Sequence, residues 1–419
     1  MFDVLLSDDE REIRNEIRLF VRDKVERSLL LKMDSKEKEY PYEFIRAAGS
    51  ANILGLRFPK EYGGRGLGWV SEMLAIEEIG VLGIALGCAY SLPSIIGEGI
   101  NKFGTEEQKK AYLAPTIRGE MICGEGLTEP RSGSDFFGTN TTAIKDDDSF
   151  IINGQKRFVA GGIGADYFLI YARTDFENKP HQSLTAFIVE RDDGVEVEEE
   201  YELMGCRGMG AARIVMTNLV VPESRIVGKL NEGADVFNAM MVPERLTSAA
   251  GPIGMGQAAM EIAARYADKR EAFGHSIRRY EGISFKIADC ATELDAARGL
   301  VYRAAKVADT GAWCRKEVSQ AKVYATEAGF RAVHEAMQIL GGIGYTDVYP
   351  IERLYRDARL ATIWTGSNEV QRMIIQHEVF RDILSQDRSN QRDVELDTPG
   401  AHKTEEKVYR EESDKYLPK

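Results

Sequence analysis

The sequence contains few cysteines and histidines, and their spacing excludes several kinds of site. The chain has 419 residues, with five cysteines and five histidines. The cysteines never form a CxxC pair, and the histidines are isolated from one another along the chain. Structural zinc sites and disulfide frameworks need such clusters. We therefore expect a reduced, cytoplasmic protein without a metal centre.

The sequence also lacks a long apolar run and an excess of positive charge. No stretch of about 18 uncharged apolar residues occurs, so no membrane span is predicted. Lys and Arg number 54 against 67 Asp and Glu, which gives a net charge of −13. Nucleic-acid binding needs a local excess of positive charge. We therefore expect neither a nucleic-acid partner nor a membrane. The acidic start of the chain, which has no basic flank, argues against a secretory or transit peptide.

The period of the apolar residues changes twice and predicts an α+β multidomain protein. Residues 1–121 have a helical period and predict an N-terminal all-α domain. Residues 122–233 contain short β-rich runs bounded by turn residues, which predict a β-barrel-like middle domain. Residues 234–384 contain four long helical patterns and predict a C-terminal four-helix bundle. The charged tail, residues 385–419, is expected to be disordered or a surface strap and is assigned no chemistry.

Two local patterns are more specific. Ser7 is followed three residues later by Glu10, the spacing of a capping box at a helix start. Within the middle domain, the β-rich run 150–159 has Asn153 and Gly154 at its centre. This dipeptide is favoured in two-residue hairpin turns, so a turn is predicted there.

Two loops contain clustered glycines. Loop 126–138 combines glycines with hydroxyl side chains, so it presents many backbone N–H groups with little obstruction. Such a loop suits an anionic or carbonyl-rich ligand; the alternative is an ordinary polar loop before the β domain. Loop 338–345 ends a helix with glycines, which is by itself the usual way for a helix to end.

In this order and spacing, the two loops resemble the acyl-CoA dehydrogenase family over residues 1–384. The resemblance implies the same helical, β-barrel-like and four-helix architecture. It also implies an FAD cofactor, an acyl-CoA substrate, an electron-transfer flavoprotein as electron acceptor, and a homo-oligomer, usually a dimer of dimers. Further segments that match are 103–110, 153–156, 270–274 and 365–369.

The resemblance also implies which residues contact FAD. Thr128 would lie near the pyrimidine end of the flavin, and Ser134 near both FAD and substrate. Arg270 and Phe273 resemble a pair that reaches across a subunit interface to a neighbour's FAD; the alternative for Arg270 is a solvated cation at a helix end. The implied set is Leu127, Thr128, Gly133, Ser134, Phe158, Val159, Ala160, Arg270, Phe273, Gln338, Gly341, Gly342, Ser367 and Glu369.

The usual catalytic base of the family is missing from its common position. Thr365 stands where the family commonly has a glutamate, and a hydroxyl is no base near neutral pH. Glu244 precedes Arg245 and Leu246 in a segment that resembles the isovaleryl-CoA and long-chain enzymes, whose base lies on this earlier helix. A carboxylate in an apolar pocket has a raised pKa, which suits proton abstraction near neutrality. The alternative is an exposed glutamate paired with Arg245.

The resemblance therefore implies an FAD-dependent acyl-CoA dehydrogenase in fatty-acid or acid degradation. Glu244 would take the α-proton, and the β-hydride would pass to flavin N5 to give a 2-enoyl-CoA. Three alternatives stay open: a flavin monooxygenase on the same fold, the reverse enoyl-CoA reductase, and a non-redox binding relative. The sequence does not choose among short, branched, cyclic or longer acyl chains. The expected substrate contacts are Ser134, Arg245, Trp364, Thr365 and Gly366.

Overall fold

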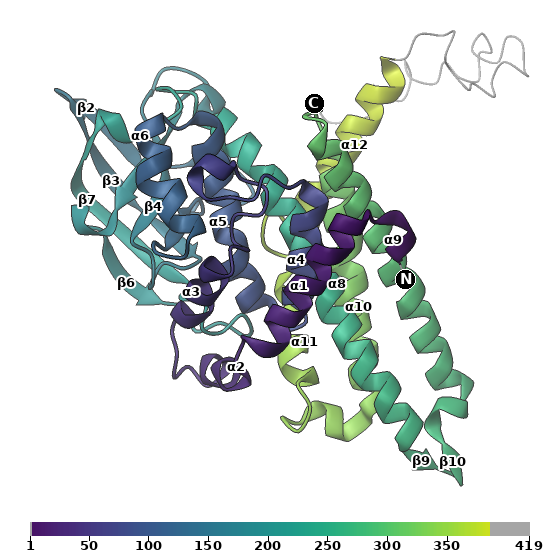
Figure 1. The fold of residues 1–419 in the computed structure, drawn as a ribbon. Coiled ribbons are helices and arrows are strands. Elements are labelled where there is room, and N and C mark those ends of the chain that lie inside the picture. The colour runs from purple at the N-terminus through teal and green to yellow at the C-terminus, as the bar shows by residue number, and fades with distance from the viewer. Residues whose placement is uncertain (1, 386–419) are drawn as a thin grey trace, which may run out of the picture. The chain divides into compact units, whose positions relative to one another are not determined.

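The computed structural model describes residues 2–385, in the order of elements drawn in Figure 1. Contacts divide the chain into two compact units, one ending at Ile375 and the other beginning at Gln376. Residues 386–419, which make up almost all of the predicted tail, lie outside the described residues. No described helix is long and apolar enough to cross a membrane. No group of three or more potential metal ligands occurs among the described residues.

The first part of the chain is helical, as predicted. The capping box at its start is present, because the Ser7 hydroxyl accepts a hydrogen bond from the Glu10 N–H while the Ser7 N–H donates to the Glu10 carboxylate. The helices are α1 (Asp8–Asp23), α2 (Arg27–Asp34), α3 (Tyr42–Ser50), α4 (Trp69–Gly80), α5 (Ile84–Phe103), α6 (Glu106–Gln108) and α7 (Ala114–Ile117), with a π-helical segment (Lys109–Leu113) between the last two. Every residue of α5 from Ile84 to Ile100 is buried, so this helix lies within the core.

The middle part forms one eight-stranded sheet, in the order β6-β7-β3-β2-β4-β5-β8, with β1 pairing in parallel with β4. The central strands β4 and β5 are buried on both faces. Residues of β4 alternate between two cores: Tyr167, Leu169 and Tyr171 join the core shared with the helices, while Phe168 and Ile170 join a second one. The strands are β1 (Cys123–Gly126), β2 (Thr142–Asp146), β3 (Ser149–Val159), β4 (Tyr167–Arg173), β5 (Leu184–Glu190), β6 (Glu196–Glu200), β7 (Ala212–Pro222) and β8 (Ile226–Val227).

The predicted turn at Asn153 and Gly154 is wrong. Strand β3 continues through both residues, and the chain reverses instead at Asp147 and Asp148, where Asp147 has a φ of 47°. Asn153 and Gly154 mark an irregularity in the pairing of β3 with β7. A Cβ atom on Gly154 would overlap the Thr141 hydroxyl. The glycine is therefore needed for a close approach inside the sheet.

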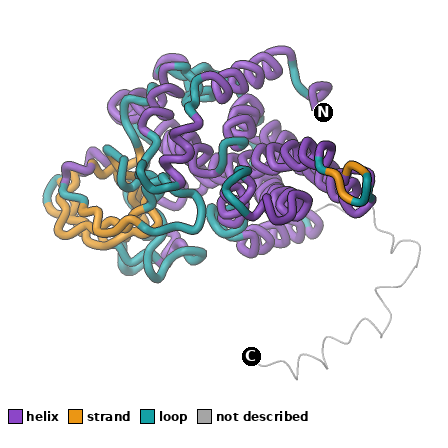
Figure 2. Tube along the Cα trace, turned by 90° about the horizontal axis from the view of Figure 1, so that it is seen from below, coloured by secondary structure: helices purple, strands orange, loops and turns teal. Residues whose placement is uncertain are grey.

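The last part is again helical. Its helices are α8 (Gly233–Lys269), α9 (Glu281–Asp309), α10 (Arg315–Leu340), α11 (Ile351–Leu360) and α12 (Asn368–Leu384). The short helix α11 was not predicted from the sequence. Helices α8 and α9 are joined by a small hairpin, β9 (Glu271–Ala272) and β10 (His275–Ser276). Figures 1 and 2 place this hairpin at the opposite end of the first unit from the eight-stranded sheet.

Helix α8 packs closely against α4 and α10 because glycines occupy the points of contact, on α8 itself or on its neighbour. A Cβ atom on Gly254 of α8 would overlap the Glu77 carbonyl oxygen of α4, and one on Gly80 would overlap the carbonyl oxygen of Gly251. A Cβ atom on Gly329 of α10 would likewise overlap the Pro252 carbonyl oxygen. The small residues of α8 therefore serve helix packing.

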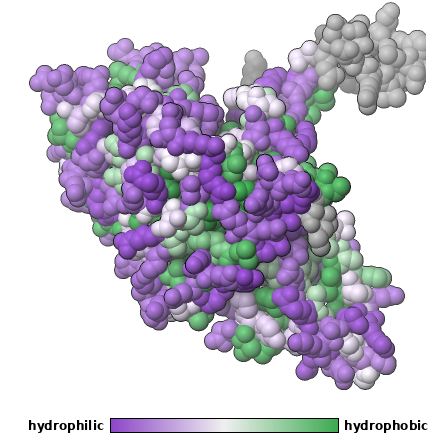
Figure 3. All heavy atoms as spheres, in the orientation of Figure 1, coloured by the Kyte–Doolittle hydropathy of each residue, from purple (hydrophilic) through white to green (hydrophobic). Residues whose placement is uncertain are grey.

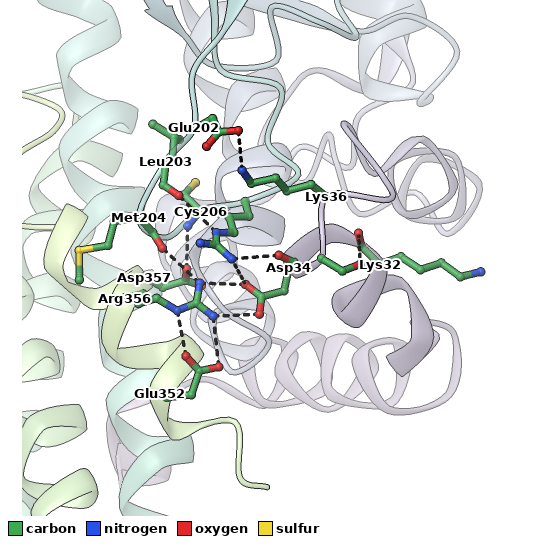
Figure 4. Close-up of polar contacts among 12 residues, drawn as sticks. Lys32, Asp34, Lys36, Glu202, Leu203, Met204, Cys206, Glu352, Arg356 and Asp357 are labelled. Carbon is green, nitrogen blue, oxygen red and sulfur yellow. Dashed lines mark hydrogen bonds and ion pairs between the residues drawn. The ribbon is translucent and has the colours of Figure 1, made fainter. Parts of the chain in front are cut away.

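A polar cluster holds α11 against the other parts of the first unit (Figure 4). The Arg356 guanidinium donates to both carboxylate oxygens of Asp34, at 2.8 and 2.9 Å. The buried Asp357 carboxylate accepts from the Cys206 N–H at 2.7 Å and from the Ile84 N–H at 3.0 Å. Asp357 thus ties α11 both to the start of α5 and to the loop that precedes β7.

Candidate active site

Glu244 lies in the interior of α8, and its side chain is buried. The exposed, solvated alternative for this residue is therefore wrong. Its Oε2 atom is buried and has no donor among the described residues. Burial raises the pKa of Glu244 to about 7, while a hydrogen bond with Glu125 and the positive charges of Arg245 and Lys322 oppose the rise. Such a carboxyl can accept a proton near neutral pH.

The charged neighbours of Glu244 come from three elements. Arg245 follows it on α8, is buried, and has an Nε atom without an acceptor among the described residues. Burial, followed by repulsion from Arg315, lowers the pKa of Arg245 to about 10. Lys322 comes from α10 and Glu125 from β1. Neither Lys322 nor Glu125 is among the site residues expected from the sequence.

Lys322 connects Glu244 with the turn that contains Thr365. Its ammonium is buried and donates to the Gly366 carbonyl at 3.1 Å and to the Asn368 side chain at 2.9 Å. Burial, followed by repulsion from Arg245, lowers the pKa of Lys322 to about 8. The same lysine also interacts with Glu244. The candidate base and this turn therefore both lie near Lys322 of α10.

The turn itself offers polar atoms that the described chain leaves without partners. Thr365 has a φ of 56°, in the left-handed region, and its hydroxyl is buried without a hydrogen bond to a described residue. The Trp364 indole N–H is in the same situation. A bound group could supply these missing partners, because buried polar atoms are normally satisfied.

A buried ion pair between Glu129 and Lys156 anchors loop 126–138, which is predicted to lie along the flavin. The Glu129 carboxylate is buried and accepts from the Lys156 ammonium at 2.7 Å and from the Thr141 hydroxyl at 2.6 Å. Although burial opposes it, this attraction holds the pKa of Glu129 below its ordinary value. Glu129 and Ser132 also exchange two backbone hydrogen bonds. The loop therefore has a fixed shape, with its glycine and hydroxyl residues Gly133 and Ser134 exposed.

Loop 126–138 and the end of β3 lie together, because the Arg157 N–H donates to the Thr128 carbonyl at 2.8 Å. Phe158 has a φ of 55°, is about half exposed, and lies with its ring centroid 4.6 Å from that of Tyr201. Val159 differs from the expectation, since its side chain is fully buried in the second core of the sheet. With no exposed surface on the residue, Val159 supports this part of the site from within the core. Leu127, Thr128 and Ala160 are partly buried.

The remaining expected FAD residues lie elsewhere. Arg270 is exposed, and Phe273 is 95% exposed with a φ of 53°, both on the segment that joins α8 to α9. Figure 1 places that segment far from the sheet, so a single chain does not bring these two residues to Thr128 or Ser134. Other expected residues that are exposed or partly buried are Gln338, Gly341 and Gly342 at the end of α10, and Ser367 and Glu369 at the start of α12.

The residues present fit a flavin cofactor. The exposed residues Gly133 and Ser134 and the half-exposed Phe158 offer hydrogen bonds and a stacking surface near the end of β3. Arg157, whose backbone N–H donates to Thr128 of this loop, has a buried Nε atom without an acceptor among the described residues. Orphaned donors beside an exposed glycine-rich loop suit a ligand that carries phosphate and carbonyl oxygens.

Three family models match this chain. They are described as the acyl-CoA dehydrogenase N-terminal domain at residues 7–120, middle domain at residues 124–219 and C-terminal domain at residues 231–380. The fold and these matches define a flavoprotein oxidoreductase. The chain belongs to the acyl-CoA dehydrogenase family, which confirms the resemblance noted in the sequence.

Individual relatives include enzymes named for both directions of the reaction. An acyl-CoA dehydrogenase of Bacillus subtilis is 39% identical over 363 residues, which cover 86% of this chain and 96% of the relative. The caffeyl-CoA reductase-Etf complex subunit CarC of Acetobacterium woodii is 37% identical over 366 residues, covering 86% of this chain and 96% of the relative.

Solved structures share the fold. Butyryl-CoA dehydrogenase from Megasphaera elsdenii is 32% identical and superposes with a TM-score of 0.86, over 90% of this chain and 99% of that one. An FAD complex of PigA has a TM-score of 0.85 over 90% of this chain and 98% of that one. Its identity is 24%, so it speaks for the fold alone.

Proposed function

We propose that this protein is an FAD-dependent acyl-CoA dehydrogenase that converts an acyl-CoA thioester to its 2-enoyl-CoA, with Glu244 as the base. The observation that carries the proposal is the buried Glu244 carboxyl, with one oxygen unpartnered and a pKa near neutrality. Lys322 links Glu244 to the turn in which Thr365 stands at the position of the common glutamate of the family. Membership of the acyl-CoA dehydrogenase family supplies the substrate class.

The residues of the chain would act on the substrate as follows. Backbone N–H near Thr365 would donate to the thioester carbonyl oxygen and stabilise the negative charge that develops on it. The Glu244 carboxylate would form a bond to the α-proton as the α C–H bond breaks. Lys322 holds the Gly366 carbonyl and thereby fixes the turn. Ser134, Arg245, Trp364 and Gly366 are the further substrate contacts of the proposal.

FAD, when bound, would supply the acceptor at N5 for the hydride that leaves the β-carbon. Loop 126–138 would bind it through Leu127, Thr128, Gly133 and Ser134, with Phe158 stacked on the ring. The expected contacts from Arg270 and Phe273 would come from a neighbouring subunit, since both residues are exposed on a segment far from this loop.

The test is an anaerobic titration of the purified holoenzyme with a panel of acyl-CoAs, followed by flavin absorbance. We expect at least one acyl-CoA to bleach the wild-type flavin. Glu244→Gln should retain FAD and lose the bleaching, because the amide cannot take the α-proton. Glu261→Gln, an exposed change on the same helix, is the matched control and should bleach as the wild type does. Unimpaired bleaching in Glu244→Gln would refute the assignment of the base.

A second candidate is the reverse reaction, reduction of a 2-enoyl-CoA. One specific observation favours it: a relative of 37% identity is named as the caffeyl-CoA reductase subunit of an Etf complex. The same residues would serve, with Glu244 returning a proton to the α-carbon. Reoxidation of chemically reduced enzyme by enoyl-CoAs, compared with bleaching by the matching acyl-CoAs, decides which direction is favoured.

The expected partners follow from the same proposal. An electron-transfer flavoprotein is the proposed electron partner, supported by the Etf complex named for the Acetobacterium woodii relative. Oxygen consumption with added reduced flavin is the measurement that would support a monooxygenase instead. Retention on a nucleic-acid column at physiological salt would support a non-redox binding role.

A further inference from the structure

Glu125 is a second carboxyl beside the candidate base, and the proposed function gives it no role. It lies in the short strand β1, in register with Leu169 of β4. Its Oε1 atom is buried and has no donor among the described residues. The Glu125 and Glu244 side chains come from different domains of the fold, yet each lies within hydrogen-bonding reach of the other. Each also has one buried oxygen without a donor among the described residues.

Two carboxyl groups in such a contact cannot both be ionised. The mutual repulsion of two adjacent carboxylates is strong where water is excluded, so the pair retains a proton that each group alone would lose. A hydrogen bond between two carboxyls also requires a proton on one of them, since a carboxylate only accepts. Above about pH 7, the pKa of Glu244, Glu125 and Glu244 therefore share one proton.

The surrounding charges decide which member of the pair is ionised. Arg245 from α8 and Lys322 from α10 both favour the charged form of Glu244. For Glu125, burial and the charge of Glu244 are the causes that raise its pKa well above the ordinary value, and no cation offsets them. The proton therefore stays on Glu125.

The other titratable groups that face the pair are uncharged. They are Cys88 from α5 and Tyr171 from β4, and burial raises the pKa of both. The Tyr171 hydroxyl is engaged with the Met240 sulfur at 3.0 Å. Neither group supplies a charge or the missing proton to the carboxyl pair.

We propose that Glu125 is a positioning residue whose protonated carboxyl donates a hydrogen bond to the Glu244 carboxylate. This bond fixes one oxygen of Glu244 and leaves the other available for the α-proton of the substrate. It also keeps Glu244 ionised in a site where burial alone would protonate it. The proposal rests on Glu244 being the base, and its tests therefore include one that needs no substrate.

The first test is the infrared spectrum of the holoenzyme above neutral pH, without acyl-CoA. A buried protonated carboxyl has a C=O stretching band separate from the carboxylate bands. We expect the wild-type spectrum to contain such a band that is missing in Glu125→Gln. An identical band in both proteins, or no protonated carboxyl in the wild type, would overturn the proposal even if acyl-CoA bleaches the flavin.

The second test compares two substitutions in the pH dependence of flavin reduction. Glu125→Gln keeps a neutral hydrogen-bond donor, so most of the rate of flavin reduction should remain. The acidic limb of its pH–rate profile should not move to higher pH. Glu125→Leu removes the donor, so the acidic limb should move upward by about one pH unit, which is about a tenfold loss at a pH on that limb. Glu196→Gln and Glu196→Leu, at an exposed position of β6, are the matched controls.

The outcomes separate this proposal from the proposed function. Equal losses in Glu125→Gln and Glu125→Leu, with no difference in their pH profiles, would mean that Glu125 only fills space, and would overturn the proposal. If Glu244→Gln still bleaches while the infrared band of Glu125 is present, the assignment of the base fails instead. A rate and pH profile that Glu125→Gln retains and Glu125→Leu loses are the result that supports the hydrogen bond.

Discussion

A carboxyl group that loses water on folding makes stability depend on pH, and Glu244 is such a group. Its pKa in the folded chain, about 7, is higher than the ordinary value of 4.5. The folded state therefore binds the proton more tightly than the unfolded state does. The contribution is favourable while the group is protonated, is lost as the pH rises from about 4.5, and is fully lost above about 7.

We therefore expect the wild-type protein without FAD to lose stability relative to Glu244→Gln as the pH rises. The difference in unfolding free energy should change by up to about 3 kcal/mol between about pH 5 and about pH 8. Denaturant unfolding of both proteins at the two pH values measures it. A difference in unfolding free energy that is the same at both pH values would contradict the raised pKa of Glu244. Glu261→Gln, an exposed substitution on the same helix, is the control.

At this scale the sequence identified only part of the site. Glu244 can be chosen from the sequence as the candidate base because it stands in a segment that resembles a known arrangement and because a threonine hydroxyl at position 365 is no base near neutral pH. Glu125 and Lys322 cannot be chosen in this way, since a charged residue read along the chain belongs by default to the surface. Lys322 lies in the buried stripe of α10 with Ala325 and Gly329, and a lysine in that stripe was the available signal.

At the scale of the elements, the crossing of α8 with α4 depends on the absence of side-chain atoms. A methyl group on Gly254 would overlap the Glu77 carbonyl oxygen, which belongs to the α4 backbone and cannot rotate away. We expect Gly254→Ala to destabilise the protein by about 3 kcal/mol, at the upper end of ordinary overpacking. Thermal unfolding measures the effect.

Gly299 in α9 provides the control for Gly254, because a Cβ atom there meets nothing within 4 Å. Gly299→Ala should be neutral or stabilising by about 0.5–1 kcal/mol, since alanine favours the helix. Equal melting temperatures for the two variants would show that α8 and α4 can move apart at little cost.

The elements also show what the sequence can and cannot predict. Ser7 and Glu10 predicted a helix start correctly because a capping box is local chemistry. Asn153 and Gly154 predicted a turn incorrectly because the glycine serves a contact with Thr141, which lies on a neighbouring segment. Local pattern decided the first case, and tertiary approach decided the second.

At the scale of the whole molecule, large apolar residues stand exposed on the helical part. Phe273 is 95% exposed, Tyr345 81% and Phe285 59%. The face drawn in Figure 3 is mostly hydrophilic, with hydrophobic residues scattered among the hydrophilic ones. Aromatic residues are enriched at protein–protein interfaces, and the partner proposed for these three is a second copy of this chain.

We expect Arg270→Met with Phe273→Ser to lower the FAD content of the purified protein and to weaken its assembly. The physical reason is that these exposed residues are proposed to contact the FAD of a neighbouring subunit. Light scattering after gel filtration and the flavin-to-protein absorbance ratio measure both effects. Phe176→Ser, at another exposed aromatic residue, is the control. Full FAD content in a purely monomeric wild type would contradict the shared site.

The Asp357 carboxylate, which accepts from the backbone of residues 84 and 206, bears on how such a gene can be cut or recombined. A fragment that ends before α11 would keep two amide groups with no anion to receive them, and a fragment that contains α11 would carry an anion without its donors. Swapping a single domain between homologous enzymes would therefore succeed only where the incoming piece preserves both amide positions. A breakpoint that shifts either amide would leave the buried Asp357 carboxylate short of a donor and lower the stability of the chimaera.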